Sequence, residues 1–323
     1  MKMDTSWLEI SLIVDGERAE AVAEALARYI PNGVAIETTA VTANEDDEGG
    51  RAVGPLRVCG YLPVDDQLEQ NRQKIVEALW YLGRITPMPE AQYRTVNEED
   101  WAEAWKQHYH PIAIGQRLMI TPAWLESPDP ARISIRMDPG MAFGTGTHPT
   151  TQLCLELVEA AVDGREGLPA MAGGPSGATV IDVGCGSGIL SVAALKLGMK
   201  EAVGVDIDAR AAAISLENAQ LNGVSERYRA GAGSVTEALR GDFGPRQAPL
   251  VLANILAPIL LRLLGDGSQP GLAELVSPGG VLILSGILDY QAEEVVQAAA
   301  ARGLRLIVRK QIADWVALAV QRD

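Results

Sequence analysis

The sequence has little cysteine and lacks a long uninterrupted apolar run. Its three cysteines, Cys59, Cys154 and Cys185, are far apart and odd in number, so they imply no disulfide framework and fit a reducing compartment. Residues 1–7 contain no apolar stretch of the kind found in signal peptides. The longest apolar run, residues 250–264, is interrupted by Asn, Pro and Arg and is too short to span a bilayer. We therefore expect a soluble, cytoplasmic protein with no membrane association.

Basic charge is also scarce. The 323 residues include 27 Lys and Arg against 42 Asp and Glu, which gives a net charge of −15 at pH 7. An acidic surface repels phosphate backbones, so we expect no direct nucleic-acid binding. It is compatible with a basic partner, although many proteins are acidic for solubility alone. The three histidines, His108, His110 and His148, lack the Cys or carboxylate spacing of a metal site, and we expect no metal.

The first third of the chain alternates strand and helix patterns. Runs of apolar and β-branched residues predict strands, and Ala-rich segments with helical spacing predict helices. The predicted order is β-α-β-β-α-β, which indicates a small α+β domain of ferredoxin-like type over residues 1–97. The strands are expected at 7–14, 34–38, 56–62 and 91–96, and the helices at 17–29 and 65–82.

A connecting segment follows this domain. The spacing of apolar residues over 98–109 predicts a helix that packs between two domains. We place the linker at 98–120 and the second domain at 121–323. A strand pair at 117–121 and 132–137 leads into the second domain.

From residue 179 the pattern becomes a strand, a Gly-rich turn and a helix, repeated. This alternation predicts an α/β fold with a doubly wound parallel sheet and helices on both faces. A final strand pair at 304–309 and 315–320 predicts an antiparallel hairpin at the sheet edge, which is typical of the methyltransferase variant of this fold and not of the nicotinamide-binding one. The other strands are expected at 179–183, 202–205, 250–253 and 281–285, and the helices at 188–197, 209–221, 258–264 and 290–301.

The strongest motif is a glycine-rich loop that follows a buried apolar strand. Gly184, Gly186 and Gly188 alternate with small residues before a helix, and glycine lets the backbone approach a ligand closely. Asp206 follows about 20 positions later, where doubly wound folds hold ribose hydroxyls. The dinucleotide fingerprint G-x-G-x-x-G has a wider spacing. The tighter spacing here, and Asp182 just before the loop, favour S-adenosylmethionine over NAD, because its amino and carboxylate groups need a carboxylate, carbonyls and N–H donors.

Two further segments place polar side chains where a site is expected. Residues 138–151 hold three glycines, four threonines and His148, a composition that favours a ligand-covering loop over a simple capped helix start. His148 is a candidate proton acceptor. Asn254 ends an apolar strand, where its amide oxygen can orient an amine nucleophile or cap a turn, and both interpretations stay open. Cys185 has no base beside it in sequence and is interpreted as structural.

At these motifs the sequence closely resembles the bacterial ribosomal protein L-eleven methyltransferases, a family of class I enzymes that use S-adenosylmethionine. The order of segments also agrees with that family, so the resemblance covers most of the chain. The loop at 143–151 is much more specific than the glycine motif, which all such methyltransferases share. The likeness rests on residues 138–151, 182–190, 204–208, 253–256 and 285–288.

The resemblance implies both a fold and an activity. The fold is a seven-stranded methyltransferase sheet preceded by a small substrate-recognition domain. The activity is transfer of methyl groups from S-adenosylmethionine to the α-amine and lysine ε-amines of ribosomal protein L-eleven, which leaves S-adenosylhomocysteine. Carried over by motif, Thr151, Gly184, Asp206 and Asn254 contact the cofactor, and Asp182 and Gly186 are expected to bind it as well. Asn254 is followed by Ile-Leu-Ala where related amine and amide methyltransferases carry Pro-Pro-Tyr, which argues against glutamine or adenine methylation.

The first domain carries no motif matched to the family, so alternatives to this substrate remain. They are another protein, a small amine, or a ribosome-assembly factor that binds the cofactor without needing the chemistry. The catalytic residue is unassigned, and Asn254 and His148 are candidates for orienting the amine. Displacement at a sulfonium depends mainly on alignment, and a lysine with a pKa of about 10.4 must first lose its proton.

Overall fold

The structure is a computed structural model that describes residues 6–30, 34–38, 41–42, 51–52, 55–84, 87–97, 110–138, 146–265 and 267–323. The chain divides into two compact units. The amino-terminal unit comprises Met1–His110 with Pro139–Met141, and the carboxy-terminal unit comprises Pro111–Asp138 with Ala142–Asp323. The helix expected over 98–109 lies outside the described residues, so the linker and the domain boundaries stay predictions.

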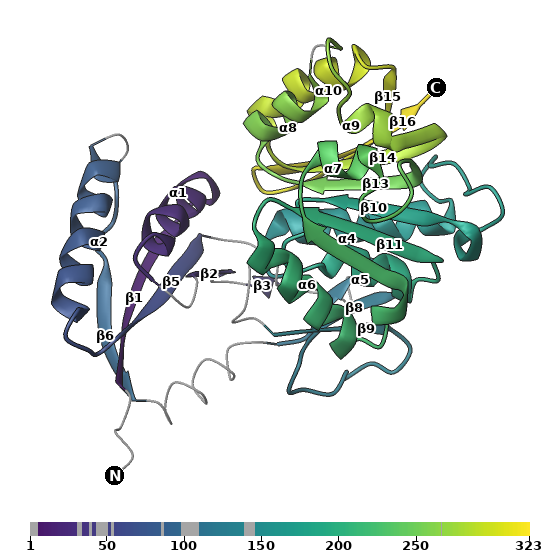
Figure 1. Cartoon of the computed structure of the whole chain (residues 1–323). Helices are drawn as coiled ribbons and strands as arrows, with labels where there is room; N and C mark the ends of the chain where they lie inside the picture. Colours follow the sequence, from purple (N-terminus) through teal and green to yellow (C-terminus); the bar gives the residue numbers. More distant parts are fainter. Residues whose placement is uncertain are drawn as a thin grey trace. The chain divides into compact units, whose positions relative to one another are not determined.

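The amino-terminal unit contains a four-stranded antiparallel sheet in the order β2-β5-β1-β6, with two helices packed on it (Figure 1). Alternate residues of β1, Ile10, Leu12 and Val14, are buried in one cluster with Leu26 of the first helix and Ile75 of the second. This alternation is why the segment forms a strand with one face in the core. The elements are β1 (Ser6–Val14), α1 (Gly16–Ala27), β2 (Val34–Thr38), β3 (Val41–Thr42), β4 (Arg51–Ala52), β5 (Leu56–Pro63), α2 (Leu68–Gly83) and β6 (Gln92–Asn97).

The main sheet of this unit follows the predicted order β-α-β-β-α-β, and its ferredoxin-like classification stays a prediction. The two-residue strands β3 and β4 pair with each other and were not predicted. In the carboxy-terminal unit, a three-stranded sheet of β7 (Ile112–Ile114), β8 (Leu118–Pro122) and β9 (Ile133–Met137) comes first. The expected strand pair corresponds to β8 and β9, which run parallel. With three residues, β7 is too short to show a pattern in the sequence.

The second sheet of the carboxy-terminal unit has seven strands, in the order β12-β11-β10-β13-β14-β16-β15. This confirms the predicted seven-stranded doubly wound sheet. Neighbouring strands are parallel except where β16 pairs with β14 and with β15. The strands are β10 (Thr179–Val183), β11 (Glu201–Asp206), β12 (Tyr228–Ala232), β13 (Ala248–Asn254), β14 (Val276–Leu288), β15 (Leu304–Ile312) and β16 (Trp315–Arg322).

Helices cover both faces of this sheet, because its inner strands are apolar on both sides. Val180 and Leu250 are buried in one cluster, and their neighbours in sequence, Ile181 and Val251, are buried in a second. The helices are α4 (Pro149–Asp163), α5 (Ile189–Lys196), α6 (Ala209–Leu221), α7 (Val235–Arg240), α8 (Ala257–Leu264), α9 (Leu272–Leu275) and α10 (Ala292–Ala300), with single 3-10 turns at Pro175–Gly177, Ser225–Arg227 and Asp289–Gln291.

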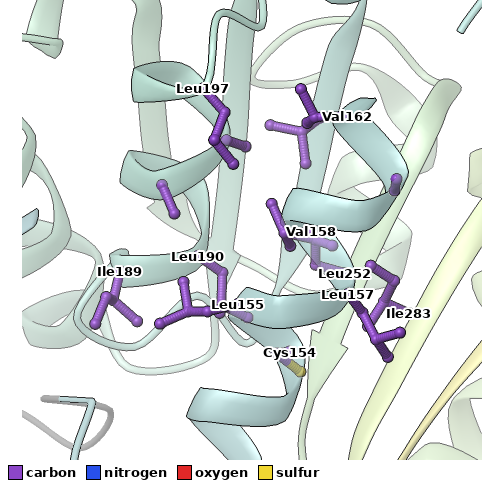
Figure 2. Packing of buried hydrophobic residues seen from close by; sticks show 14 of the residues in the cluster. Cys154, Leu155, Leu157, Val158, Val162, Ile189, Leu190, Leu197, Leu252 and Ile283 are labelled. Carbon is purple, nitrogen blue, oxygen red and sulfur yellow. The ribbon is translucent and has the colours of Figure 1, made fainter. Parts of the chain in front are cut away.

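Figure 2 shows part of the first cluster, where α4 and α5 pack against each other and against the sheet. Leu155 and Val158 project from α4 and Leu190 from α5, while Leu252 and Ile283 belong to the strands below them. Each of these five side chains is at most 5% exposed. Burying an aliphatic side chain of this size contributes about 1.5–3 kcal/mol, so this layer holds both helices against the sheet.

The hairpin formed by β15 and β16 extends the sheet beyond β14. β16 lies between β14 and β15, and its residues Trp315–Val320 are all buried. The sequence predicted the antiparallel hairpin correctly, and β15 is its edge strand.

The strand order reverses between β10 and β13. From β10 the chain builds outward through β11 and β12, and from β13 it builds outward on the other side through β14. Ligands of open α/β sheets bind beyond the carboxyl ends of the strands at such a switch point. The sheet therefore directs attention to Gly184, after β10, and to Asn254, at the end of β13. None of the described helices combines the length and the apolar character needed to cross a membrane.

Candidate active site

The glycine loop forms a tight turn at the switch point. Gly184 and Gly188 have φ of +70° and +76°, a region that side chains other than glycine rarely adopt. The N–H groups of Gly184 and Cys185 both donate to the carbonyl of Val205, at 2.8 and 3.1 Å. A Cβ on Gly188 would lie 2.8 Å from Cβ and 3.2 Å from Cα of Ser215. The turn is thus fixed to β11 and packed against α6, with little freedom to move.

Asp206 joins this turn to the end of β11. Its Oδ2 accepts the N–H of Gly186 at 2.9 Å, and its Oδ1 accepts the N–H of Asp208 at 2.9 Å. The side chain is half-buried. A carboxylate oxygen has two lone-pair directions, so each can accept a further hydrogen bond from a ligand hydroxyl. Gly186 and Asp206, which are 20 positions apart in sequence, therefore lie next to each other at the switch point.

Asp182 lies in β10, two residues before the turn, and is 1% exposed. Its Oδ2 accepts from the hydroxyl of Ser191 at 2.7 Å, whereas its Oδ1 has no hydrogen-bond partner among the described residues. Burial raises the pKa of this carboxyl to about 7. An unpaired buried acceptor costs about 1–3 kcal/mol, and a ligand that supplies an N–H donor or positive charge would offset that cost.

Asn254 and Thr151 contact each other although 103 residues separate them. The Nδ2 of Asn254 donates a hydrogen bond to the Oγ1 of Thr151 at 3.5 Å. Thr151 is fully buried in the first turn of α4, and Asn254 is half-buried opposite Ser285 of β14. An amide that donates through Nδ2 keeps its Oδ1 as an acceptor. The structure brings together two residues that the sequence could only name separately.

His148 begins α4 and is 4% exposed. Its Nδ1 accepts the N–H of Thr150 at 3.3 Å and lies 2.7 Å from the Thr150 hydroxyl. The ring packs edge-on against Trp315, with centroids 4.9 Å apart. Burial lowers its pKa to about 4, so the ring is neutral near pH 7. With Nδ1 accepting, the neutral tautomer carries its proton on Nε2. This geometry describes a helix cap and gives no support to His148 as proton acceptor, which stays a prediction.

Cys154 and Cys185 are buried free thiols. Burial raises the pKa of Cys185 to about 12, and burial also raises the pKa of Cys154. The thiolate is the reactive form of cysteine, so neither is suited to act as a nucleophile near neutral pH. This supports the structural interpretation of Cys185. Among the described residues, no group of three or more His, Cys, Asp or Glu is arranged to hold a metal ion.

Sequence reasoning missed Ile207, which follows Asp206 directly. Its side chain is 87% exposed at the carboxyl end of β11, which is unusual for a large aliphatic residue. The sequence feature that could have indicated its exposure is an isoleucine between two aspartates at a strand end. Of the distinctive loop at 138–151, residues 139–145 lie outside the described part of the chain, so their expected role as a ligand cover stays a prediction.

Comparison with known proteins agrees with this geometry. A family model described as "Ribosomal protein L11 methyltransferase (PrmA)" matches residues 6–323. Two relatives named "Ribosomal protein L11 methyltransferase" are similar over almost their whole length. The one from Chloroflexus aurantiacus is 42% identical over 98% of this chain and 98% of its own, and the one from Herpetosiphon aurantiacus is 40% identical over 96% and 97%. The crystal structure of ribosomal protein L11 methylase from Lactobacillus delbrueckii subsp. bulgaricus is 31% identical, with a TM-score of 0.54, and covers 67% of this chain and 98% of that one.

Proposed function

Because this chain belongs to the ribosomal protein L11 methyltransferase family, we propose that it transfers methyl groups from S-adenosylmethionine to the α-amine and lysine ε-amines of ribosomal protein L11. It is a methyltransferase, and S-adenosylmethionine is its cofactor. The family match over residues 6–323 carries the substrate proposal, because it includes the amino-terminal unit as well as the catalytic sheet.

The residues at the switch point fit this cofactor. Asp206 is our proposed partner of the ribose hydroxyls, since both its oxygens keep lone pairs beyond their backbone contacts. Gly184 and Gly186 supply the close backbone for the methionine end. The unpaired Oδ1 of Asp182 suits the positively charged amino group, and Thr151 adds a hydroxyl. When bound, the cofactor supplies a methyl group on a positively charged sulfur, which makes it reactive toward amines.

For the acceptor amine, Asn254 is our proposed orienting residue. Its amide stands at the carboxyl end of β13, and its Oδ1 can accept an N–H and so aim the nitrogen lone pair. An α-amine with a pKa of about 7.7–8.0 is partly neutral at cellular pH, whereas a lysine near about 10.4 is mostly charged. Removal of water around a lysine lowers its pKa. We therefore assign Asn254 to positioning, and desolvation to promoting loss of the lysine proton.

The test is to incubate the purified protein with S-adenosylmethionine and recombinant L11, and to measure the intact mass of L11. We expect added methyl masses, which Asp206→Ala abolishes by weakening cofactor binding. An unmodified L11, with cofactor binding retained, would leave the methyltransferase fold in place and reject the substrate. The remaining candidates would then be another protein, a small amine, or a role in ribosome assembly that needs only cofactor binding.

Two further expectations belong to this proposal. The proposed substrate is a ribosomal protein, so we place the activity in the cytoplasm. The net charge of −15 suits a basic protein substrate better than direct contact with nucleic acid. No membrane partner is proposed.

A further inference from the structure

Two large apolar side chains are exposed at the carboxyl edge of the catalytic sheet, on the side of the switch point where β13 and β14 lie. Leu256 is 42% exposed and follows Asn254 by two residues, and Tyr290 is 71% exposed just after β14. Both precede helices, α8 and α10, which pack side by side on the same face of the sheet (Figure 1). Both side chains therefore lie at the same edge as the amide that we assign to the acceptor amine. We call Leu256 and Tyr290 the acceptor rim.

The two rim residues follow their strands at different separations along the chain. Asn254 is in register with Ser285, and β14 continues for three residues beyond Ser285, to Leu288. The backbone is irregular directly after Ser285, where Gly286 has a φ of +82°. Tyr290 follows Ser285 by five residues, whereas Leu256 follows Asn254 by two. We therefore assign Leu256 to the aliphatic stem of the acceptor lysine and Tyr290 to substrate residues that flank that lysine.

The charges around the rim indicate the kind of segment that it receives. Asp289 precedes Tyr290, its backbone N–H donates to the carbonyl of Asp314 at 2.8 Å, and Glu293 and Glu294 occupy the first turn of α10. These four acidic residues, including Asp314, are all exposed. Arg309 pairs with Asp289, which leaves an excess of negative charge in this group.

We propose that the acceptor rim binds a lysine-bearing, positively charged segment of the protein substrate, with Tyr290 as its main apolar contact. This inference rests on the proposed function, because it names the surface through which that substrate reaches Asn254. An exposed tyrosine offers large contact area at low entropic cost, and truncation of such residues in interfaces often has large effects. The surrounding carboxylates steer a basic segment toward the rim.

Steady-state methylation of intact L11 tests the rim. We expect Tyr290→Ala to raise KM for L11 by about tenfold, with kcat and the Kd for S-adenosylmethionine little changed, and Tyr290→Phe to restore the wild-type KM. The matched control is Leu306→Ala. Leu306 is 37% exposed near the start of β15, away from the carboxyl ends of the parallel strands where the acceptor rim lies. Equal KM values for Tyr290→Ala, Leu306→Ala and the wild type would overturn the proposal.

A second measurement tests the charges. KM of the wild type should rise with salt concentration, and the Glu293→Gln/Glu294→Gln double variant should show a weaker salt dependence. An unchanged salt dependence would reject steering by these carboxylates. Loss of cofactor affinity in Tyr290→Ala, or dissociation of a wild-type dimer by that substitution, would instead assign the rim to the cofactor or to self-association. If wild-type protein leaves L11 unmodified, the proposed function fails before the rim is tested.

Discussion

At the scale of single residues, the carboxyl of Asp182 is 1% exposed and its Oδ1 has no hydrogen-bond partner among the described residues. Burial raises its pKa to about 7, above the value of about 3.9 for an unfolded aspartate. Between these values the folded protein holds a proton that the unfolded chain releases. Its contribution to stability is therefore fully present below about pH 4 and is lost as the pH rises through 7.

Asp182→Asn is expected to remove this pH dependence, because asparagine stays neutral in the same shape. At pH 8 and without cofactor, the variant should be more stable than the wild type by about 1–3 kcal/mol, while its affinity for S-adenosylmethionine falls. Denaturant unfolding between pH 5 and 8 measures the first effect, and titration calorimetry measures the second. Parallel stability curves for the two proteins would show that Asp182 is ionised in the fold at no cost.

His148 offers a second prediction at this scale, since its Nδ1 caps α4. Asparagine also caps helices, whereas alanine does not. We expect His148→Ala to be less stable than His148→Asn by about 1 kcal/mol. If the imidazole only caps, His148→Asn should keep most of the wild-type kcat. A large loss of kcat in a folded His148→Asn protein would support the prediction that the histidine is a proton acceptor.

At the scale of secondary-structure elements, the packing of α5 on α6 depends on the glycine between them. Gly188→Ala combines a φ of +76° with a Cβ that would lie 2.8 Å from Cβ and 3.2 Å from Cα of Ser215. Gly223 is a matched control, because its φ is +69° and nothing lies within 4 Å of its Cβ position.

Gly223→Ala should lower the free energy of unfolding by about 1–2 kcal/mol, which is the cost of the left-handed backbone conformation alone. Gly188→Ala should lose about 1–3 kcal/mol more from overpacking, and it should also bind S-adenosylmethionine more weakly. Thermal unfolding of both variants, with and without the cofactor, measures the difference. Similar losses in the two proteins would mean that α6 moves away from the turn without penalty.

The strands that the sequence predicted best are those buried on both faces. β10 and β13 consist mainly of buried apolar residues, so their pattern was clear. β12 was not predicted, because its residues Tyr228–Ala232 end in Ala-Gly-Ala, which carries no strand signal. Its place at the sheet edge is set by pairing with β11, a contact between distant segments that local pattern does not reveal.

In the candidate site, too, local sequence pattern was predictable and contacts between distant segments were not. The sequence identified the glycine turn and Asp206 because their spacing is local and follows a known chemistry. The pairing of Asn254 with Thr151 spans 103 residues, and the packing of His148 on Trp315 joins α4 to the last strand. Spacing along the chain cannot predict either contact, so the interpretation of His148 as a cap became available only from the fold.

At the scale of the whole molecule, each of the two units has a hydrophobic core of its own. The core of the amino-terminal unit contains only residues before 97, and both other clusters contain only residues after 111. The proposed cofactor residues, from Thr151 to Asn254, all belong to the carboxy-terminal unit.

A fragment of residues 111–323 is therefore expected to unfold cooperatively and to bind S-adenosylmethionine within a few-fold of the whole chain. It should lose nearly all methylation of L11, since the first unit is our proposed substrate-recognition domain. Calorimetry and intact-mass measurement of L11 test the two halves of this prediction. A fragment that methylates L11 at the full rate would move substrate recognition entirely to the catalytic unit.

The position of β16 has a consequence for the order of events during synthesis. β16 is the last strand of the catalytic sheet in chain order, yet it lies between β14 and β15, and its residues Trp315–Val320 are buried. During translation amino-terminal domains generally fold first, so the first unit can form while the catalytic sheet still lacks an inner strand. The catalytic sheet can therefore be completed only after β16 has been synthesised, because β15 is joined to β14 through β16.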